Sequence, residues 1–274
     1  MLSVIGRSLS EGEKNDSSFW EQRLPQLAKS EIGSVHVYDE IIIDEFQDLT
    51  AEPYLDFISQ SLKGGLQSGS WKFFGDFEKQ MLYESSLSLK TLMGGRLAGV
   101  AMYEMRINCR NTPRIASMAR YLGGMSPNYK RVLRSDDGIE PQLIYYSSEN
   151  DQLVKLEALI EKYRKDGFEL RDIIILSGKS EPESCAHRLA QKEKWSNVLK
   201  QFSFDQNGFL AYTSIHAFKG LERSVVILTD LSDFSSDTTL SRCYVGMSRA
   251  LNRLSVLVGA EEQGAIITRM VGIK

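Results

Sequence analysis

The chain has 274 residues, of which 42% are hydrophobic and 25% charged, and its formal net charge is −3. This length accommodates two domains or one large domain, and the composition is that of an ordinary globular protein. The net charge excludes a broadly basic surface that coats nucleic acid, so we expect any nucleic-acid contact to be local and confined to a groove.

Cysteine usage and the N-terminal sequence indicate the compartment. Cys109, Cys185 and Cys243 are far apart and odd in number, which indicates neither a disulfide framework nor a zinc site. No apolar run approaches the length that spans a membrane, and the first residues lack the apolar core of a signal peptide. We therefore expect a reduced, cytoplasmic compartment and no membrane partner.

Residues 1–37 are polar and irregular, so few regular elements are expected there. In chain order we expect a short helix at 18–29, a strand at 38–43, an amphipathic helix at 54–62 and a strand at 71–74. The three consecutive isoleucines of the first strand suit a strand buried on both faces. Residues 84–101 are rich in serine, glycine and leucine, and are interpreted as the connection to a second domain.

The rest of the chain alternates between predicted strands and helices. Strands are expected at 142–146, 172–176, 210–213, 224–229 and 253–258, and helices at 112–122, 151–166, 181–194 and 238–250. This alternation predicts an α/β architecture with parallel strands.

Carboxylates follow the strand at 38–43, in the run Asp44-Glu45-Phe46-Gln47-Asp48. Active groups of open α/β sheets lie just past the carboxyl ends of strands. Nucleotide hydrolysis needs one acidic residue to hold Mg²⁺ on the phosphates and a second group to orient or deprotonate the attacking water. The alternative is a capping region, in which Asp48 or Thr50 caps a helix that begins near Glu52.

Three further groups of residues are candidates for binding phosphate. Residues 75–80 follow the second predicted strand, where Gln80 can hydrogen-bond a phosphate oxygen, although a turn before a polar helix explains the same pattern. Arg106, Arg110 and Arg114 recur every four residues, which suits phosphate binding or a solvated basic helix face. Residues 241–250 place two arginines about two helical turns apart, and an arginine from a second domain commonly stabilises a transferring phosphoryl group.

Taken in chain order, five stretches resemble the motifs of superfamily 1 DNA helicases of the UvrD/Rep type. The stretches that are similar to motifs II, III, IV, V and VI are 44–48, 75–80, 105–112, 213–222 and 244–250. The resemblance covers residues 40–258, and the stretch similar to motif V is the most diagnostic. It implies a RecA-like parallel-sheet fold, with a partial first RecA-like domain at 1–100 and a complete second one at 101–274.

The resemblance assigns a role to each matching position. Asp44 would bind Mg²⁺ and Glu45 would act as the catalytic base. Gln80 and Arg110 would sense the γ-phosphate of ATP, and Arg249 would be the arginine finger.

Three further positions follow from the resemblance to motif V. Glu222 would hold the ribose hydroxyl, while Thr213 and His216 would lie near single-stranded DNA and link it to the nucleotide. His216 has an alternative reading, because a lone histidine after a buried strand often satisfies backbone groups. Gly220 is explained by a tight turn alone.

The sequence departs from the family upstream of residue 41. The family requires a phosphate-binding loop, G-x-x-x-x-G-K-[ST], and nothing before Ile41 fits that pattern. Gly178-Lys179-Ser180 is rejected because Ile173 stands where the leading glycine is needed and because it follows motif IV. We therefore expect the sheet of the first domain to have an exposed edge or to borrow a strand.

Two classes of function remain open. The chain is either the C-terminal part of an ATP-driven translocase on single-stranded DNA, completed by an upstream domain or a second polypeptide, or a degenerate module that binds nucleic acid or a protein without hydrolysis. In either case ATP and Mg²⁺ are expected to bind tightly only with the missing segment. The chain alone is expected to be inactive as an ATP hydrolase.

Overall fold

A computed structural model describes residues 6, 8–14, 16, 18–32, 38–77, 88–124, 129–204 and 208–272. The chain divides into two compact units, unit 1 (Met1–Glu104) and unit 2 (Met105–Lys274). Each unit is described by itself below.

The N-terminal helices of unit 1 pack on one another and on the helix α4 (Glu52–Ser61). They comprise α2 (Glu11–Lys14), the π-helical turn η1 (Phe19–Arg23) and α3 (Leu24–Ile32). A helix is thus present where one was expected, and it extends to Ile32. Two polar contacts fix α4 to these helices: the Tyr54 hydroxyl donates to the Trp20 carbonyl at 2.5 Å, and Lys29 pairs with Asp56 at 2.9 Å.

The sheet of unit 1 consists of two parallel strands, β1 (Glu40–Ile43) and β2 (Ser70–Phe73), with Ile41 opposite Trp71 and Ile43 opposite Phe73. One face packs on the core of the unit, which comprises Phe46, Leu55, Ile58, Leu66, Leu92 and Leu97. The helices α5 (Gly65–Ser68) and α6 (Leu89–Gly94) contribute to this core along with α4.

The other face of this sheet exposes Ile42, which corrects the expectation of a strand buried on both faces. Ile42 is 62% exposed, because successive side chains of β1 alternate between the core and the open face. Within the described residues each strand pairs with one neighbour, so both outer edges are unpaired, in agreement with the expected exposed edge.

Two segments of unit 1 differ in detail from the readings of the sequence. Helix α4 has Ala51 as its N-cap and Pro53 in its first turn, without a side-chain cap, so neither Asp48 nor Thr50 caps it. Asp48 instead lies in the 3-10 helix η2 (Phe46–Leu49). Residues 88–101 do more than connect, because they include α6 and place Leu92 and Leu97 in the core.

Unit 2 is built on a six-stranded sheet in which every pairing is parallel, in the order β5-β10-β9-β6-β8-β7. The strands are β5 (Gln142–Tyr146), β6 (Ile173–Ser177), β7 (Leu199–Gln201), β8 (Leu210–Ser214), β9 (Arg223–Leu231) and β10 (Ala250–Gly259). The central strand β6 is buried along its whole length, as its apolar run predicts. The predicted α/β class with parallel strands is confirmed.

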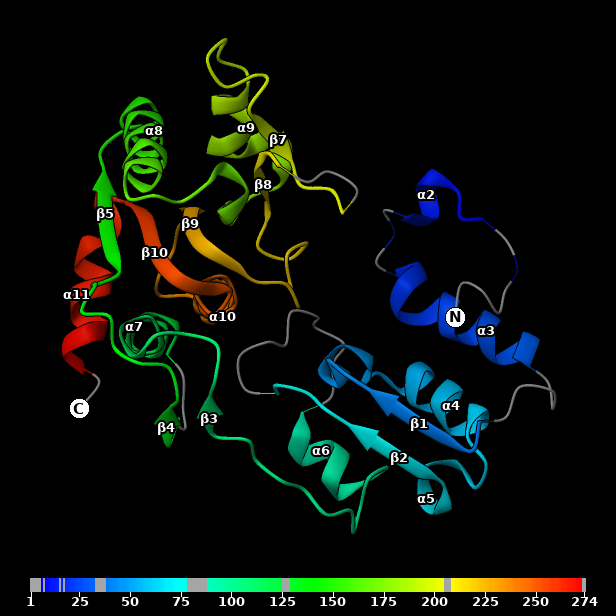
Figure 1. The fold of residues 1–274 in the computed structure, drawn as a ribbon. Helices are drawn as coiled ribbons and strands as arrows, with labels where there is room; N and C mark the ends of the chain where they lie inside the picture. The colour runs from blue at the N-terminus through cyan, green and yellow to red at the C-terminus, as the bar shows by residue number, and fades with distance from the viewer. Residues whose placement is uncertain are drawn as a thin grey trace. The chain divides into compact units, whose positions relative to one another are not determined.

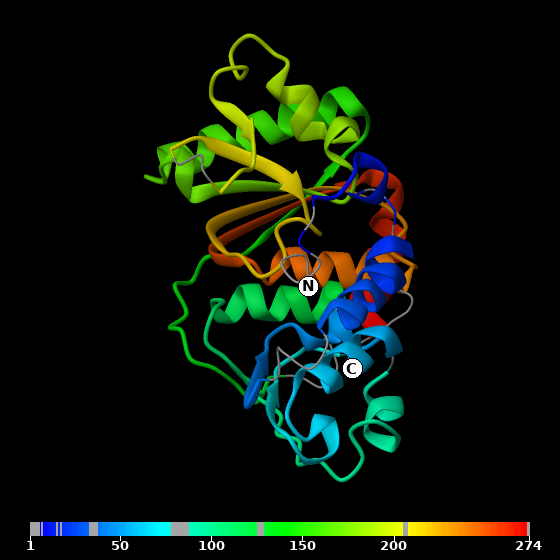
Figure 2. The same ribbon diagram turned by 90° about the vertical axis from the view of Figure 1, so that its right-hand side faces the viewer.

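Helices cover both faces of this sheet (Figures 1 and 2). Helices α7 (Pro113–Gly123), α10 (Asp237–Met247) and α11 (Gln263–Gly272) lie on one face, and α8 (Glu149–Lys165) and α9 (Cys185–Ala190) on the other. This arrangement is consistent with a RecA-like domain. The strand β7 and the helix α11 were not anticipated from the sequence.

Short elements complete unit 2: the paired strands β3 (Ile107–Asn108) and β4 (Arg131–Val132) and the 3-10 turns η3 (Leu170–Asp172), η4 (Glu181–Glu183) and η5 (Ala260–Glu262). Among all described residues, no helix is long and apolar enough to cross a membrane.

Candidate functional site

The predicted catalytic carboxylates lie directly after β1. Asp44 is exposed, and its Oδ1 accepts the backbone N–H of Glu45 at 2.9 Å. Glu45 has a left-handed backbone (φ 52°, ψ 38°), which costs a residue with a side chain about 1–3 kcal/mol. This turn reverses the chain so that Phe46 enters the core, where its ring stacks on Phe73 with centroids 4.1 Å apart.

A buried glutamine connects these carboxylates to the loop after β2. The Gln47 side chain is 0% exposed, and its Nε2 donates to the Glu45 carboxylate. Its Oε1 accepts the backbone N–H of Asp76 at 3.0 Å. Gln47 carries no signal in the sequence beyond its place inside the acidic run. The structure thus brings the stretches similar to motifs II and III together.

The loop after β2 approaches Gln47 through a glycine. A Cβ atom at Gly75 would lie 2.7 Å from Gln47 Oε1 and 3.2 Å from its backbone nitrogen. Two backbone hydrogen bonds also hold this loop. Phe46 N–H donates to the Phe74 carbonyl, and Phe74 N–H donates to the Ile43 carbonyl, each at 2.8 Å. Gln80, the predicted phosphate sensor, lies outside the described residues.

In unit 2, Asn108 and Asn111 organise the turn that carries Arg110. Asn108 Oδ1 accepts the backbone N–H of Arg110 at 3.0 Å and that of Asn111 at 2.9 Å. The Arg110 side chain is thereby presented outside the turn, and its Nε donates to the Glu222 carboxylate at 3.0 Å. Two positions that were predicted to contact one nucleotide therefore contact each other.

The three arginines that recur every four residues do not share a helix. Arg106 precedes β3, Arg110 lies in the turn after it, and only Arg114 belongs to α7. Arg114 is paired with Asp136 at 2.8 Å and also with Glu140. The alternative of one solvated basic helix face is therefore wrong, because the chain bends at the asparagine-bonded turn before α7 begins.

The turn between α10 and β10 holds Arg249. Its side chain is 1% exposed, and its Nε donates to the Val245 carbonyl at 3.1 Å. Asn111 anchors both sides of this arginine, because its Nδ2 donates to the Ser248 carbonyl at 3.2 Å and to the Ala250 carbonyl at 2.7 Å. The stretches similar to motifs IV, V and VI therefore meet in unit 2, and the role of Asn111 in joining them has no signal in the sequence.

The predicted DNA-contacting residues lie at the carboxyl end of β8. Thr213 is buried, and its hydroxyl donates to Glu181 Oε1 at 2.8 Å. His216 is exposed in the turn that follows, where its carbonyl accepts the Lys219 N–H at 3.2 Å. Gly220 ends that turn with φ +81°, which supports the conformational reading of this glycine. The Glu181 carboxylate beside Thr213 was not anticipated.

A buried polar cluster closes the loop after β6. Asp230 accepts from Ser177 Oγ at 2.8 Å, from Gln152 Nε2 at 2.9 Å and from the Cys185 N–H at 3.0 Å. Burial raises the pKa of the Cys185 thiol to about 12, so this thiol is neutral. Two N–H groups of this loop are already bonded within the protein, because Lys179 N–H donates to Ser177 Oγ at 3.0 Å and Gly178 N–H to the Thr229 carbonyl at 2.9 Å. This geometry agrees with rejecting 178–180 as a phosphate-binding loop.

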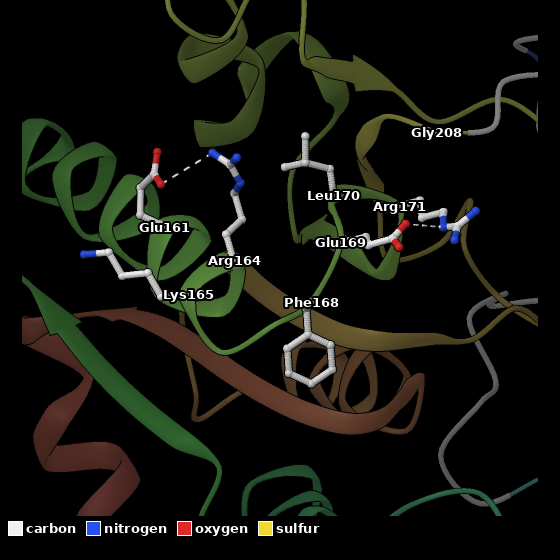
Figure 3. A pocket seen from close by; sticks show the side chains of 8 residues that line it. All are labelled: Glu161, Arg164, Lys165, Phe168, Glu169, Leu170, Arg171 and Gly208. Atoms are coloured by element: carbon white, nitrogen blue, oxygen red, sulfur yellow. Dashed lines mark ion pairs between the residues drawn. The ribbon is translucent and has the colours of Figure 1, made fainter.

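A surface cavity lies elsewhere, near the amino ends of β6 and β8 (Figure 3). Its lining residues are Glu161, Arg164, Lys165, Phe168, Glu169, Leu170, Arg171 and Gly208. The figure shows two ion pairs, Glu161–Arg164 at 3.6 Å and Glu169–Arg171 at 2.7 Å. Thr213 and Ser177 lie at the opposite, carboxyl ends of these parallel strands, so the cavity is separate from the predicted site.

Asp44 is the residue that the sequence predicts to bind Mg²⁺. Among the described residues, no group of three or more histidine, cysteine, aspartate or glutamate side chains is arranged to hold a metal ion. Mg²⁺ is commonly bound by one or two carboxylates together with substrate phosphates, and an exposed Asp44 at a strand end fits that mode.

Comparisons with known proteins identify no family. Neither protein-family models nor curated protein sequences match the chain. Among solved structures, the C-terminal domain of a possible DNA helicase from Lactobacillus plantarum WCFS1 matches at 18% identity and a TM-score of 0.40, covering 55% of this chain and 87% of that domain. Arterivirus nonstructural protein 10, a helicase, matches in a complex with DNA at 14% identity and a TM-score of 0.42, covering 85% of this chain.

A crystal structure of arterivirus nonstructural protein 10 also matches, at 14% identity and a TM-score of 0.40. The chain spans 42% and 39% of the length of these two helicase chains. At such identities and scores, the matches assign neither an activity nor a residue role to this chain.

Proposed function

We propose that the chain carries the catalytic carboxylates and the second motor domain of an ATP-dependent superfamily 1 DNA helicase or translocase of the UvrD/Rep type. The observation that carries this proposal is the meeting, in unit 2, of the turn around Arg110, the side chain of Glu222 and the turn around Arg249. These stretches are far apart in the sequence, and each resembles a different helicase motif. In this proposal, unit 1 is part of the first RecA-like domain and unit 2 is the second.

Each side chain has a defined task in the proposed reaction. Asp44 would hold Mg²⁺, which would neutralise charge on the phosphates of ATP. Glu45 orients and deprotonates the attacking water, and its carboxylate accepts a hydrogen bond from the buried Gln47 amide. Arg110 and Arg249 stabilise the charge that develops on the γ-phosphate, and Arg110 must leave Glu222 to do so.

Single-stranded DNA is the proposed partner, bound near Thr213 and His216 at the carboxyl end of β8. Because the net charge of the chain is −3, binding is expected to be weak and strongly dependent on salt. The phosphate-binding loop is proposed to come from outside this sequence, in an upstream domain or a second polypeptide. Without it, ATP loses its main electrostatic contacts.

The test is DNA-stimulated ATP hydrolysis, measured with the chain alone and with a first domain of a UvrD/Rep-type helicase supplied as a separate polypeptide. We expect negligible turnover by the chain alone and restored turnover in the mixture. Glu45→Gln and Arg249→Ala should remove the restored activity while circular dichroism stays unchanged. Salt-dependent DNA binding with no hydrolysis in any mixture would favour a degenerate, non-hydrolysing module instead.

A further inference from the structure

Gln47 contacts both loops of unit 1 that resemble helicase motifs. One end of its side chain, Nε2, donates to the Glu45 carboxylate, and the other end, Oε1, accepts the Asp76 N–H at 3.0 Å. The side chain is 0% exposed, so water does not compete for these bonds. The glutamine is therefore a direct physical connection between the two loops.

The chemistry of its partners fixes the orientation of this amide. A carboxylate only accepts and a backbone N–H only donates, so exchanging the amide oxygen and nitrogen would lose both hydrogen bonds. A glutamate at position 47 would keep the acceptor for Asp76 and lose the donor for Glu45. A methionine of similar length would lose both.

The loop after β2 leaves the amide little freedom to move. A Cβ atom at Gly75 would lie 2.7 Å from Gln47 Oε1, which is closer than real Cβ contacts. The backbone of Gly75 thus lies against the amide, and a displacement of Gly75 and Asp76 moves the acceptor side of the glutamine directly.

We infer that Gln47 is a positioning residue that ties the orientation of the Glu45 carboxylate to the position of the Gly75–Asp76 backbone. The catalytic meaning of this inference rests on the proposed function, in which Glu45 is the base. A shift of the loop after β2 turns the carboxylate, so the loop and the water-activating group respond together. Sequence resemblance gave Gln47 no such role.

The connection is tested first on the chain alone, by nitrogen-15 NMR. Glu45→Gln weakens the bond to Gln47, because a charged acceptor is replaced by a neutral one. We expect this substitution to shift the backbone amide resonance of Asp76, and we expect no such shift when Gln47→Met is already present. An equal shift of Asp76 in both backgrounds overturns the inference.

The close contact between Gly75 and the Gln47 amide can be tested with a matched pair of variants. Gly75→Ala places a methyl group against Gln47, whereas Gly94→Ala, in α6 of the same unit, meets nothing within 4 Å. We expect Gly75→Ala, and not Gly94→Ala, to shift the Gln47 side-chain amide resonance. If both variants leave that resonance in place, the amide does not sense the loop and the inference fails.

A kinetic measurement separates positioning from general stability. In the mixture with the supplied first domain, Gln47→Glu is expected to lower kcat about 10–100-fold with little change in the KM for ATP, because Gln47 acts through the base. The matched control is Gln152→Glu, since Gln152 is also buried and donates to a carboxylate, Asp230, in unit 2. Gln152→Glu should lower the activity only in proportion to the fraction of the protein that is unfolded.

The outcomes distinguish this inference from the proposed function. A Gln47→Glu variant that turns over like the wild type, or that raises KM alone, overturns the inference and leaves the proposed function intact. A wild-type mixture that hydrolyses no ATP contradicts the proposed function. The two NMR experiments then still decide whether Gln47 connects the loops.

Discussion

Arg110 donates its Nε to the carboxylate of Glu222 at 3.0 Å, although 112 residues separate them in the chain. Their side chains remain 40% and 51% exposed, so water screens the pair. A contact of this kind is easily exchanged for another. That property suits an arginine that is proposed to turn toward a phosphate.

We predict that the Arg110–Glu222 ion pair contributes little to the free energy of unfolding. Glu222→Gln should change the free energy of unfolding by less than about 1 kcal/mol, because exposed ion pairs contribute little. Urea unfolding of the two single variants, Arg110→Met and Glu222→Gln, and of the double variant measures the coupling. A coupling of several kcal/mol would show instead that the pair is a fixed structural contact.

Asn111 should be far more important for stability than its surface neighbours. It is 2% exposed, and its Nδ2 donates to the carbonyls of Ser248 and Ala250. Asn111→Ala should cost about 1–3 kcal/mol, because buried carbonyls lose their donor. Asn111→Asp should cost more, since a carboxylate would face two carbonyl oxygens. Urea unfolding checks the order, and an aspartate variant as stable as the wild type would contradict it.

Metal binding should depend on Asp44. Mn²⁺, used as a paramagnetic substitute for Mg²⁺, should broaden NMR resonances around Asp44 and Glu45 weakly, because a single exposed carboxylate holds the ion without phosphates. Asp44→Asn should abolish this broadening. Asp39→Asn is the control, since Asp39 is an exposed carboxylate of the same unit that pairs with Lys63. Broadening that survives in Asp44→Asn would place the ion elsewhere.

The affinity for single-stranded DNA should rise when Glu181 loses its charge. Its carboxylate accepts the Thr213 hydroxyl at 2.8 Å, at the place where DNA phosphates are proposed to lie. Glu181→Gln keeps an acceptor there and removes repulsion, so we expect binding to tighten about 3–10-fold at low salt. Fluorescence anisotropy with labelled oligo(dT) measures this. Glu161→Gln, at the opposite ends of the strands, removes the same charge and should have little effect.

Acid should weaken the attachment of α3 to α4. The Lys29 ammonium, and after it the Arg96 guanidinium, hold the pKa of the Asp56 carboxyl below its usual value of 3.8. A lowered folded-state pKa gives stability that is present above the unfolded value and is lost as the pH falls through the folded value. Because Asp56 is 37% exposed, the contribution is below about 1 kcal/mol.

The matching experiment compares urea unfolding at pH 6 and pH 3. The wild type should lose more stability between these two values than Asp56→Asn, which has no charge to lose. An identical pH dependence in the two proteins would mean that other carboxylates dominate the acid response.

The sequence predicted the architecture of unit 2 well, because its signals are local and strong. The apolar run at 173–177 and the alternation of strands with helices require a parallel sheet, and five of the six strands were located. The sixth, β7, has three residues at the edge of the sheet, where pairing with β8 rather than composition makes the strand. In unit 1, the run of three isoleucines predicts that Ile42 is buried, yet Ile42 is exposed. Its exposure depends on which elements cover the sheet, and the sequence of the strand does not specify them.

The charged residues of the candidate site could be proposed from the sequence, whereas the residues that hold them in place could not. Acidic and basic side chains after strands indicate phosphate chemistry from the sequence alone. Gln47, Asn111 and Glu181 gave no comparable signal, because each acts through a partner distant in the sequence: Asp76, Ser248 and Thr213. Those pairings exist only once the strands are in register.

The close approach of Gly75 to Gln47 also restricts which amino acids can replace these two residues during evolution. A side chain at position 75 would displace the Gln47 amide, and a shorter residue at position 47 would no longer span the distance between Glu45 and Asp76. Single substitutions at either position are therefore disadvantageous. Related sequences should keep both residues or replace both together.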